Sequence, residues 1–109
     1  MSTLSLYLEK DDKEFGDFTI AYRIHSTKNM FRRNIKQEEV EYILRFGEII
    51  EEYKDDFPFP SVLINGKTTE NKQLHVVAGI NKDELIIVVI TTYIPDPFKW
   101  SENYSRRLI

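Results

Sequence analysis

The apolar run at residues 85–90 constrains the fold of this 109-residue chain more than any other segment. Its six consecutive Leu, Ile and Val side chains would point to both faces of a strand, so that strand must be buried on each side within a sheet. A membrane-spanning helix needs about 20 apolar residues, so we interpret the run as part of a folded domain. With 41% hydrophobic residues, the chain can form one core, and we predict a single domain at residues 1–109.

Alternating apolar residues predict further strands, because successive side chains in a strand point to opposite faces. This alternation runs through Leu4, Leu6 and Leu8 and again through residues 18–24. The charged stretch between the two segments predicts a hairpin connection. The remaining strand-like segments are residues 48–53, 61–65, 73–81 and 84–94.

Two helices are predicted between these strands. Residues 26–33 contain no Gly or Pro, and Asn34 accepts the left-handed backbone conformation that ends helices. Residues 39–44 carry one apolar stripe at helical spacing, and Gly47 ends that helix. We expect a further short helix in the tail after residue 97. The order of elements predicts an α+β fold with two helices packed on an antiparallel sheet.

Charge is unevenly distributed in a chain whose net charge is −3. Residues 23–37 carry five cations and no acidic side chain, whereas residues 38–56 carry eight acidic side chains and two cations. A polyanion responds to the field within about 10 Å at ordinary salt, so a local cationic surface can bind RNA. The alternative is a solvated basic helix paired with its acidic neighbour. The candidate RNA-binding residues are Lys28, Arg32, Arg106 and Arg107.

Histidine is the natural proton carrier near neutral pH, and RNA cleavage by its own 2′-hydroxyl needs such a base. His25 begins the cationic segment, with helix capping or a core role as the alternative. His75 lies in a strand, where position alone favours a structural or surface role. Tyr93, near the end of the last strand, suits a phosphate or base contact, or an amphipathic core position. Trp100 could stack a base, although pinning the tail to the sheet is the favoured role.

No cofactor or metal site is predicted. The chain has no cysteine, which excludes a disulfide, a thiol nucleophile and a thiolate metal site. The acidic segment contains neither an Asp-x-Asp loop nor a His-x-x-x-His pair. The N-terminal sequence has no basic lead and no apolar stretch of the kind found in signal peptides, so we expect a cytoplasmic protein without a membrane anchor.

Five short motifs follow one another between Tyr22 and Trp100. They are residues 25–35, Glu38-Glu39-Val40, Gly47-Glu48-Ile49, Leu74-His75-Val76-Val77 and Thr91-Thr92-Tyr93-Ile94-Pro95. In this order they resemble the small bacterial and phage-borne family called domain of unknown function 4258. Asn29 stands where the family has its first motif arginine, and Asn34 stands where it has glycine.

The resemblance implies a relation to the ribonuclease toxins of the barnase–EndoU–colicin–RelE group, whose core has two helices before an antiparallel sheet. It implies a metal-independent endoribonuclease acting on RNA, as the toxin of a toxin–antitoxin pair. The protein partner would be an acidic antitoxin or one with a YgiT-type zinc finger. His25, Arg33, His75 and Tyr93 fall on recurring positions of the family pattern and are the candidate catalytic residues.

The expected chemistry is attack of the 2′-hydroxyl on the adjacent phosphate, which gives a 2′,3′-cyclic phosphate. Either histidine would be the base, and the other histidine or Tyr93 would protonate the leaving oxygen. Arg33, with Arg32 or Arg106, would stabilise the charge on the phosphorane. Two alternatives are a non-catalytic module that binds a protein partner and a metalloenzyme that uses histidine and carboxylate ligands.

Overall fold

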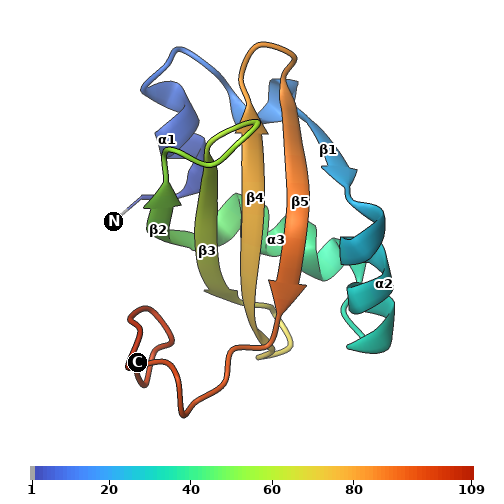
Figure 1. Cartoon of the computed structure of the whole chain (residues 1–109), viewed down its shortest axis with the longest axis vertical. Coiled ribbons are helices and arrows are strands. Elements are labelled where there is room, and N and C mark those ends of the chain that lie inside the picture. The colour runs from blue at the N-terminus through green and yellow to red at the C-terminus, as the bar shows by residue number, and fades with distance from the viewer. Residues whose placement is uncertain (1) are drawn as a thin grey trace.

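Five strands form one mixed sheet in the computed structural model, which describes residues 2–109. The strands lie in the order β1-β5-β4-β3-β2 (Figure 1). The last four strands form an antiparallel meander, and the first runs parallel to β5. The α+β class is therefore confirmed, but the prediction of a purely antiparallel sheet is wrong. The bounds are β1 Thr19–Tyr22, β2 Glu48–Tyr53, β3 Ser61–Lys67, β4 Gln73–Asn81 and β5 Ile86–Tyr93.

The N-terminal segment with alternating leucines forms a helix, α1 (Leu4–Glu9), and not the predicted strand. Leu4 and Leu8 are fully buried, and their spacing of four fits one face of a helix as well as one face of a strand. The Thr3 hydroxyl accepts a hydrogen bond from the Leu6 backbone N–H at 3.3 Å, which caps the helix. Because this segment is a helix, the predicted hairpin does not form, and β1 pairs with β5.

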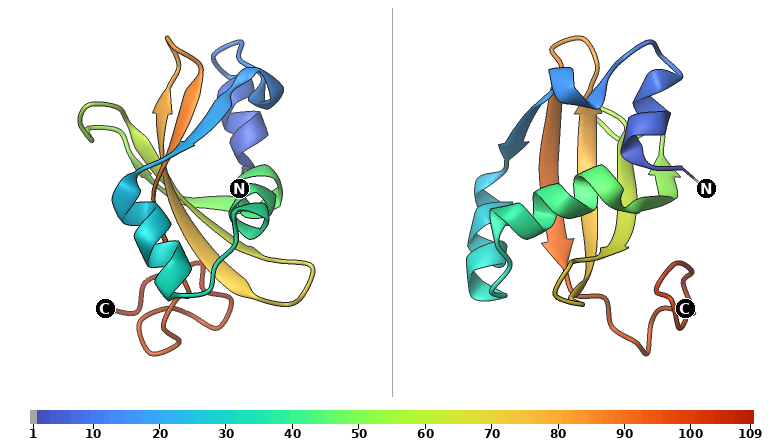
Figure 2. Two further views of the ribbon diagram at one scale, coloured as in Figure 1. Left: turned by 90° about the vertical axis from the view of Figure 1, so that its right-hand side faces the viewer. Right: turned by 180° about the vertical axis from the view of Figure 1, so that it is seen from behind.

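The two predicted helices are α2 (Ile24–Arg32) and α3 (Gln37–Phe46). Asn34 ends the first helix in the left-handed conformation, with a φ of 56°, as predicted. Figure 2 shows α1 and α3 across one face of the sheet and α2 beside the end of β1. No helix in residues 2–109 is long and apolar enough to cross a bilayer.

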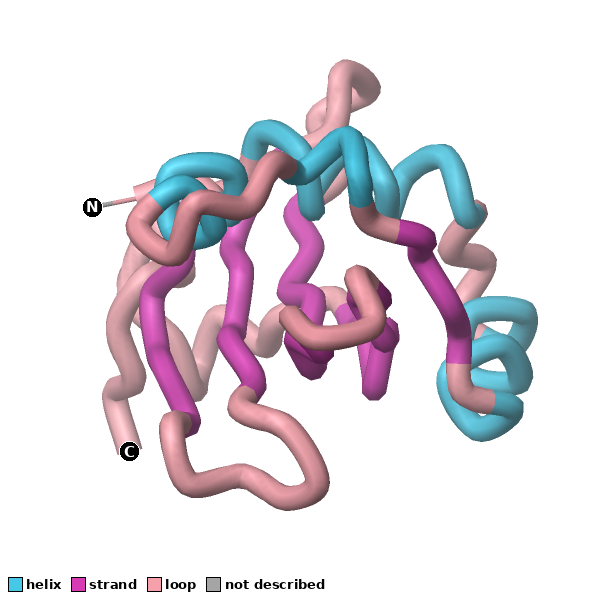
Figure 3. Tube along the Cα trace, turned by 90° about the horizontal axis from the view of Figure 1, so that it is seen from above, coloured by secondary structure: helices cyan, strands magenta, loops and turns pink. Residues whose placement is uncertain are grey.

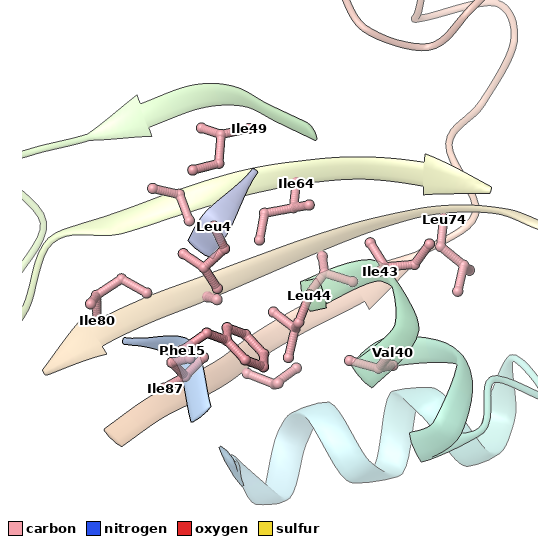
Figure 4. Packing of buried hydrophobic residues seen from close by; sticks show 14 of the residues in the cluster. Leu4, Phe15, Val40, Ile43, Leu44, Ile49, Ile64, Leu74, Ile80 and Ile87 are labelled. Carbon is pink, nitrogen blue, oxygen red and sulfur yellow. The ribbon is translucent and has the colours of Figure 1, made fainter. Parts of the chain in front are cut away.

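The core lies between the sheet and the two helices α1 and α3 (Figures 3 and 4). Ile43 and Leu44 of α3 pack there against alternate residues of the central strands. Leu74 and the other even-numbered residues of β4 face this core, so His75, Val77 and Gly79 face the opposite side. We call that opposite side the front face.

The tail after β5 does not form the expected helix. Trp100 pairs with Arg107 in a single antiparallel bridge, and backbone hydrogen bonds join Ser101 to Arg106 and Leu108 to Lys99, each at 2.8 Å. We call residues 99–108 the C-terminal hairpin. The Asn103 side chain accepts hydrogen bonds from the serine residues around it, and such local side-chain bonds compete with helix formation.

Gly47 ends α3 for a different reason from the one predicted. Its backbone is extended, with a φ of −74°, but a Cβ would lie only 2.6 Å from both the Ile43 carbonyl oxygen and the Ile64 Cγ2. We therefore expect Gly47→Ala to lower the free energy of unfolding by about 1–3 kcal/mol in urea denaturation. Gly16→Ala is the control, because a Cβ there meets nothing within 4 Å; equal losses in both variants would contradict the prediction.

Candidate functional site

His75 is fully buried on the front face, and both of its ring nitrogens have partners. Nδ1 lies 3.2 Å from the Tyr93 hydroxyl oxygen, and Nε2 lies 2.8 Å from the Tyr104 carbonyl oxygen. Because a carbonyl oxygen only accepts, Nε2 carries a proton, and in the neutral imidazole Nδ1 then accepts a hydrogen bond from the Tyr93 hydroxyl. These contacts assign His75 to the neutral Nε2–H tautomer.

A β-bulge in β5 places Tyr93 beside His75. Val77 pairs with Thr91 while its neighbour Ala78 pairs with Val89, which leaves Ile90 as an extra residue. The extra residue reverses the alternation of β5, so that Tyr93 points to the front face although the unbroken pattern would point it into the core. His75 and Tyr93 are directly opposed in the register, and their ring centroids are 5.3 Å apart.

The C-terminal hairpin covers His75. The Trp100 ring is 5% exposed and lies perpendicular to the imidazole, with centroids 4.4 Å apart, so Trp100 pins the tail to the sheet as the sequence favoured. The Arg107 guanidinium lies 4.8 Å from the centre of the Trp100 ring. It also makes two hydrogen bonds to the Glu51 carboxylate on β2, at 2.8 and 3.1 Å, which is the bidentate geometry that arginine favours.

Burial lowers the pKa of His75 below its ordinary value of 6.5, although the hydrogen bond to the Tyr104 carbonyl and the charge of Glu51 oppose this shift. The unfolded chain therefore binds this proton more tightly than the folded chain. We expect the free energy of unfolding to fall as the pH drops below about 6.5, by at most about 1.4 kcal/mol per pH unit.

Urea denaturation between pH 5 and pH 8, followed by the fluorescence of Trp100, measures this dependence. His75→Gln is expected to flatten the slope between pH 5 and pH 6.5, and His25→Gln, which removes an exposed imidazole, is the control. An equally steep slope in His75→Gln and the unsubstituted protein would contradict the assignment to His75.

Arg33, the residue after α2, contacts the backbone of β5. Its Nη1 donates a hydrogen bond to the Thr92 carbonyl oxygen at 2.7 Å, and the Thr92 hydroxyl donates to the His75 carbonyl oxygen at 2.8 Å. Two of the four candidate catalytic residues, His75 and Tyr93, are therefore in contact at the end of β5, and Arg33 reaches the backbone of the residue before Tyr93. His25 is not among them, because it is exposed in the first turn of α2, about 12 Å along the helix from Arg33.

The cations of α2 point to solvent. Ser26 and Met30 are the buried residues of this helix, so Lys28 and Arg32 lie on its exposed sides. Within residues 2–109 the ion pairs are Lys72–Glu39, Lys82–Asp11 and Arg107–Glu51. The basic helix is therefore solvated, as the alternative considered from the sequence expected, but none of these ion pairs involves a cation of α2.

Apolar side chains are interleaved with these cations. Phe31 is 89% exposed and Ile24 is 75% exposed, and their separation of seven residues places them on one face of the helix. A shallow cavity of about 530 Å³ lies against Phe31, Lys28 and Arg32. An aromatic ring between cations is the arrangement on which single-stranded nucleic acids stack.

The tail arginines differ in their surroundings. Arg107 is held by Glu51, whereas Arg106 is exposed and lines a polar cavity of about 310 Å³ with Ser101 and Asn103. Within residues 2–109, no three His, Asp or Glu side chains gather as a possible metal site. The Tyr104 carbonyl and Glu51 were missed by the sequence reasoning, since no residue pattern indicates which backbone carbonyl will meet a buried histidine.

A family model described as domain of unknown function (DUF4258) matches residues 22–94. No curated protein and no solved structure matches the chain. The matched span runs from the last residue of β1 to just beyond β5 and leaves out α1 and the C-terminal hairpin. Because the match covers more than half of the sequence, the chain belongs to the DUF4258 family.

Proposed function

We propose that this protein is a metal-independent endoribonuclease that binds RNA along α2 and cleaves it beside Tyr93. The observation that carries the proposal is the hydrogen bond from Arg33 to the Thr92 carbonyl oxygen at 2.7 Å. This bond connects the C-terminal end of the basic helix with the end of β5, where Tyr93 contacts His75. We assign proton transfer to Tyr93 and His75, and RNA bound on the cationic helix would reach them past Arg33.

The helix α2 would bind the RNA backbone and at least one base. Lys28 and Arg32 would contact phosphates, with the exposed Phe31 ring available for stacking. Exposed His25 would lie beside the same backbone. The order of two helices followed by an antiparallel meander also agrees with the resemblance to the barnase–EndoU–colicin–RelE group, and Arg106 would add a cation from the tail.

In the proposed reaction, Tyr93 rather than a histidine touches the substrate, because His75 is fully buried while Tyr93 is only partly buried. Burial raises the pKa of Tyr93, so its hydroxyl is protonated at neutral pH and can act only within a relay. The 2′-hydroxyl gives its proton to the Tyr93 oxygen as the Tyr93 proton passes to Nδ1 of His75. Arg33 would stabilise the negative charge on the phosphorane.

As the 2′-oxygen bonds to phosphorus, the bond to the 5′-oxygen breaks with its electron pair on that oxygen. The leaving oxygen takes a proton from water, and the products are a 2′,3′-cyclic phosphate and a free 5′-hydroxyl. His75 then returns its proton through Tyr93 to solvent. Every proton is accounted for by Tyr93, His75 and water, without a metal ion.

The proposal is tested with an oligonucleotide that carries one ribonucleotide among 2′-deoxynucleotides, incubated with the protein in EDTA. We expect cleavage directly after the ribonucleotide and none in the all-deoxy oligonucleotide. An uncut substrate at high protein concentration, or equal cleavage of both oligonucleotides, would overturn the proposal.

The second candidate is a module that binds a protein without catalysis. The exposed Ile24 and Phe31 between cations favour it, since an acidic partner such as an antitoxin would cover both the apolar and the charged side chains. This candidate predicts a stable complex with the acidic protein but no cleaved RNA in the assay above.

The RNA-binding role of α2 gives a separate prediction. Lys28→Gln and Arg32→Gln are each expected to weaken single-stranded RNA binding and to reduce the slope of log K against log salt by about 0.7 for each phosphate that the variant no longer neutralises. Fluorescence anisotropy at several salt concentrations measures this slope. Lys10→Gln, at the residue after α1, is the control, and a salt slope that changes as much in the control as in the α2 variants would contradict the role of α2.

A further inference from the structure

We infer that the C-terminal hairpin is part of the reactive site: the Tyr104 carbonyl oxygen positions His75 so that Nδ1 faces the Tyr93 hydroxyl. This inference rests on the proposed function and names a positioning group outside residues 22–94, the span that the family model matches. The hairpin would thus supply what the family core does not contain, namely the acceptor that fixes the orientation of the imidazole.

Three groups form one chain of hydrogen bonds: the Tyr93 hydroxyl, the His75 imidazole and the Tyr104 carbonyl as the terminal acceptor. Tyr93 donates to Nδ1 at 3.2 Å, and Nε2 donates to the Tyr104 carbonyl at 2.8 Å. The third group of such a set orients the base and keeps it in the tautomer that can accept a proton. Without the Tyr104 carbonyl, a neutral His75 would also populate the Nδ1–H tautomer, which cannot accept the Tyr93 proton.

The backbone of Tyr104 is held in an unusual conformation. Its φ of 61° lies in the left-handed region, which is costly for a bulky residue and persists only where the surroundings enforce it. The Tyr104 N–H donates to the Ser101 carbonyl at 2.8 Å, and the Asn65 side chain on β3 donates to the Asn103 carbonyl at 3.0 Å. These bonds hold the turn in the position from which the Tyr104 carbonyl meets His75.

The hairpin is fastened to the sheet at two points. Trp100 packs against the imidazole, and Arg107 joins the hairpin to Glu51 on β2. The charged groups that act on His75 are therefore Glu51 and Arg107, and the titratable Tyr93 contacts it from β5. Breaking the pair between Arg107 and Glu51 from either side should loosen the Tyr104 carbonyl. The two changes remove opposite charges that act on the pKa of His75, so an effect that they share is not a charge effect.

The test measures the tautomer directly and the reaction separately. Nitrogen-15 NMR of the full chain resolves the His75 ring, with His25→Gln used only in the NMR sample to leave one histidine. We expect one neutral Nε2–H tautomer in the parent protein and a mixture of tautomers in Glu51→Gln and in Arg107→Gln. Only Arg107→Gln removes a cation. A loss of activity that Glu51→Gln shares therefore reports the loosened hairpin and not weaker RNA binding.

For the reaction, both variants are expected to lower kcat, by less than the about 10²–10⁴-fold that one positioned acid–base group contributes, and to shift the pH–rate profile, with KM nearly unchanged in Glu51→Gln. Phe98→Ala, an exposed residue of the same tail, should change neither. A mixed or Nδ1–H tautomer in the parent protein would overturn the inference whatever the activity. Faster cleavage by Glu51→Gln would also overturn it, because the hairpin would then be a lid. An Nε2–H tautomer with no RNA cleavage would instead support the positioning geometry while the proposed function fails.

Discussion

Tyr93→Phe is expected to slow RNA cleavage by about 10²–10⁴-fold, the usual contribution of one positioned acid–base group. The variant keeps the ring that packs 5.3 Å from His75 and removes only the hydroxyl that donates to Nδ1. The fold and the RNA affinity should therefore be retained, so that the loss falls on kcat rather than on KM.

Steady-state cleavage of a fluorescent oligonucleotide in EDTA measures kcat and KM, and anisotropy measures RNA binding. The control is Tyr42→Phe on α3, whose ring packs against Phe46 away from His75. Cleavage by Tyr93→Phe at the rate of the unsubstituted protein would remove Tyr93 from the reaction.

Trp100→Ala is expected to lower the free energy of unfolding by about 3–5 kcal/mol, as found for large aromatic residues removed from well-packed sites. Trp100 is 5% exposed, and its loss removes both the surface that covers His75 and the ring beneath Arg107. The remaining cavity would lie beside a buried imidazole, which would then be open to water.

Because Trp100 is the only tryptophan, unfolding of the variant must be followed by circular dichroism. Phe98→Ala is the matched control, since its ring is 86% exposed in the same tail, and we expect it to change stability by less than about 0.5 kcal/mol. A similarly small loss in Trp100→Ala would show that the hairpin contributes little to the folded state.

The sequence predicted an element correctly where its local signals allowed a single interpretation. The Asn34 stop and the apolar stripe of α3 each had one local interpretation, and the structure confirms both. The leucines at positions 4 and 8 fitted two periods at once; in the structure they form one buried face of a helix that Thr3 caps. The parallel pairing of β1 with β5 joins segments more than 60 residues apart, which no local pattern specifies.

The candidate site was also predicted only in part, because local patterns do not specify which distant segments come into contact. The motifs placed Arg33, His75 and Tyr93 among the candidate residues; the structure puts the His75 and Tyr93 side chains in contact, while Arg33 reaches only the Thr92 backbone. The motifs could not separate them from His25, because the distance between two segments is set by the packing of α2 and not by sequence spacing. The Tyr104 contact depends on a backbone carbonyl in a turn, so residue identity carries no signal for it.

The most direct test of cleavage by the Tyr93–His75 pair is to identify the ends of the RNA products by mass spectrometry after incubation in EDTA. We expect 2′,3′-cyclic phosphate ends from the unsubstituted protein and their near-complete loss with Tyr93→Phe. Intact RNA, products with 3′-hydroxyl ends, or cyclic phosphates formed equally by both proteins would contradict the proposed reaction.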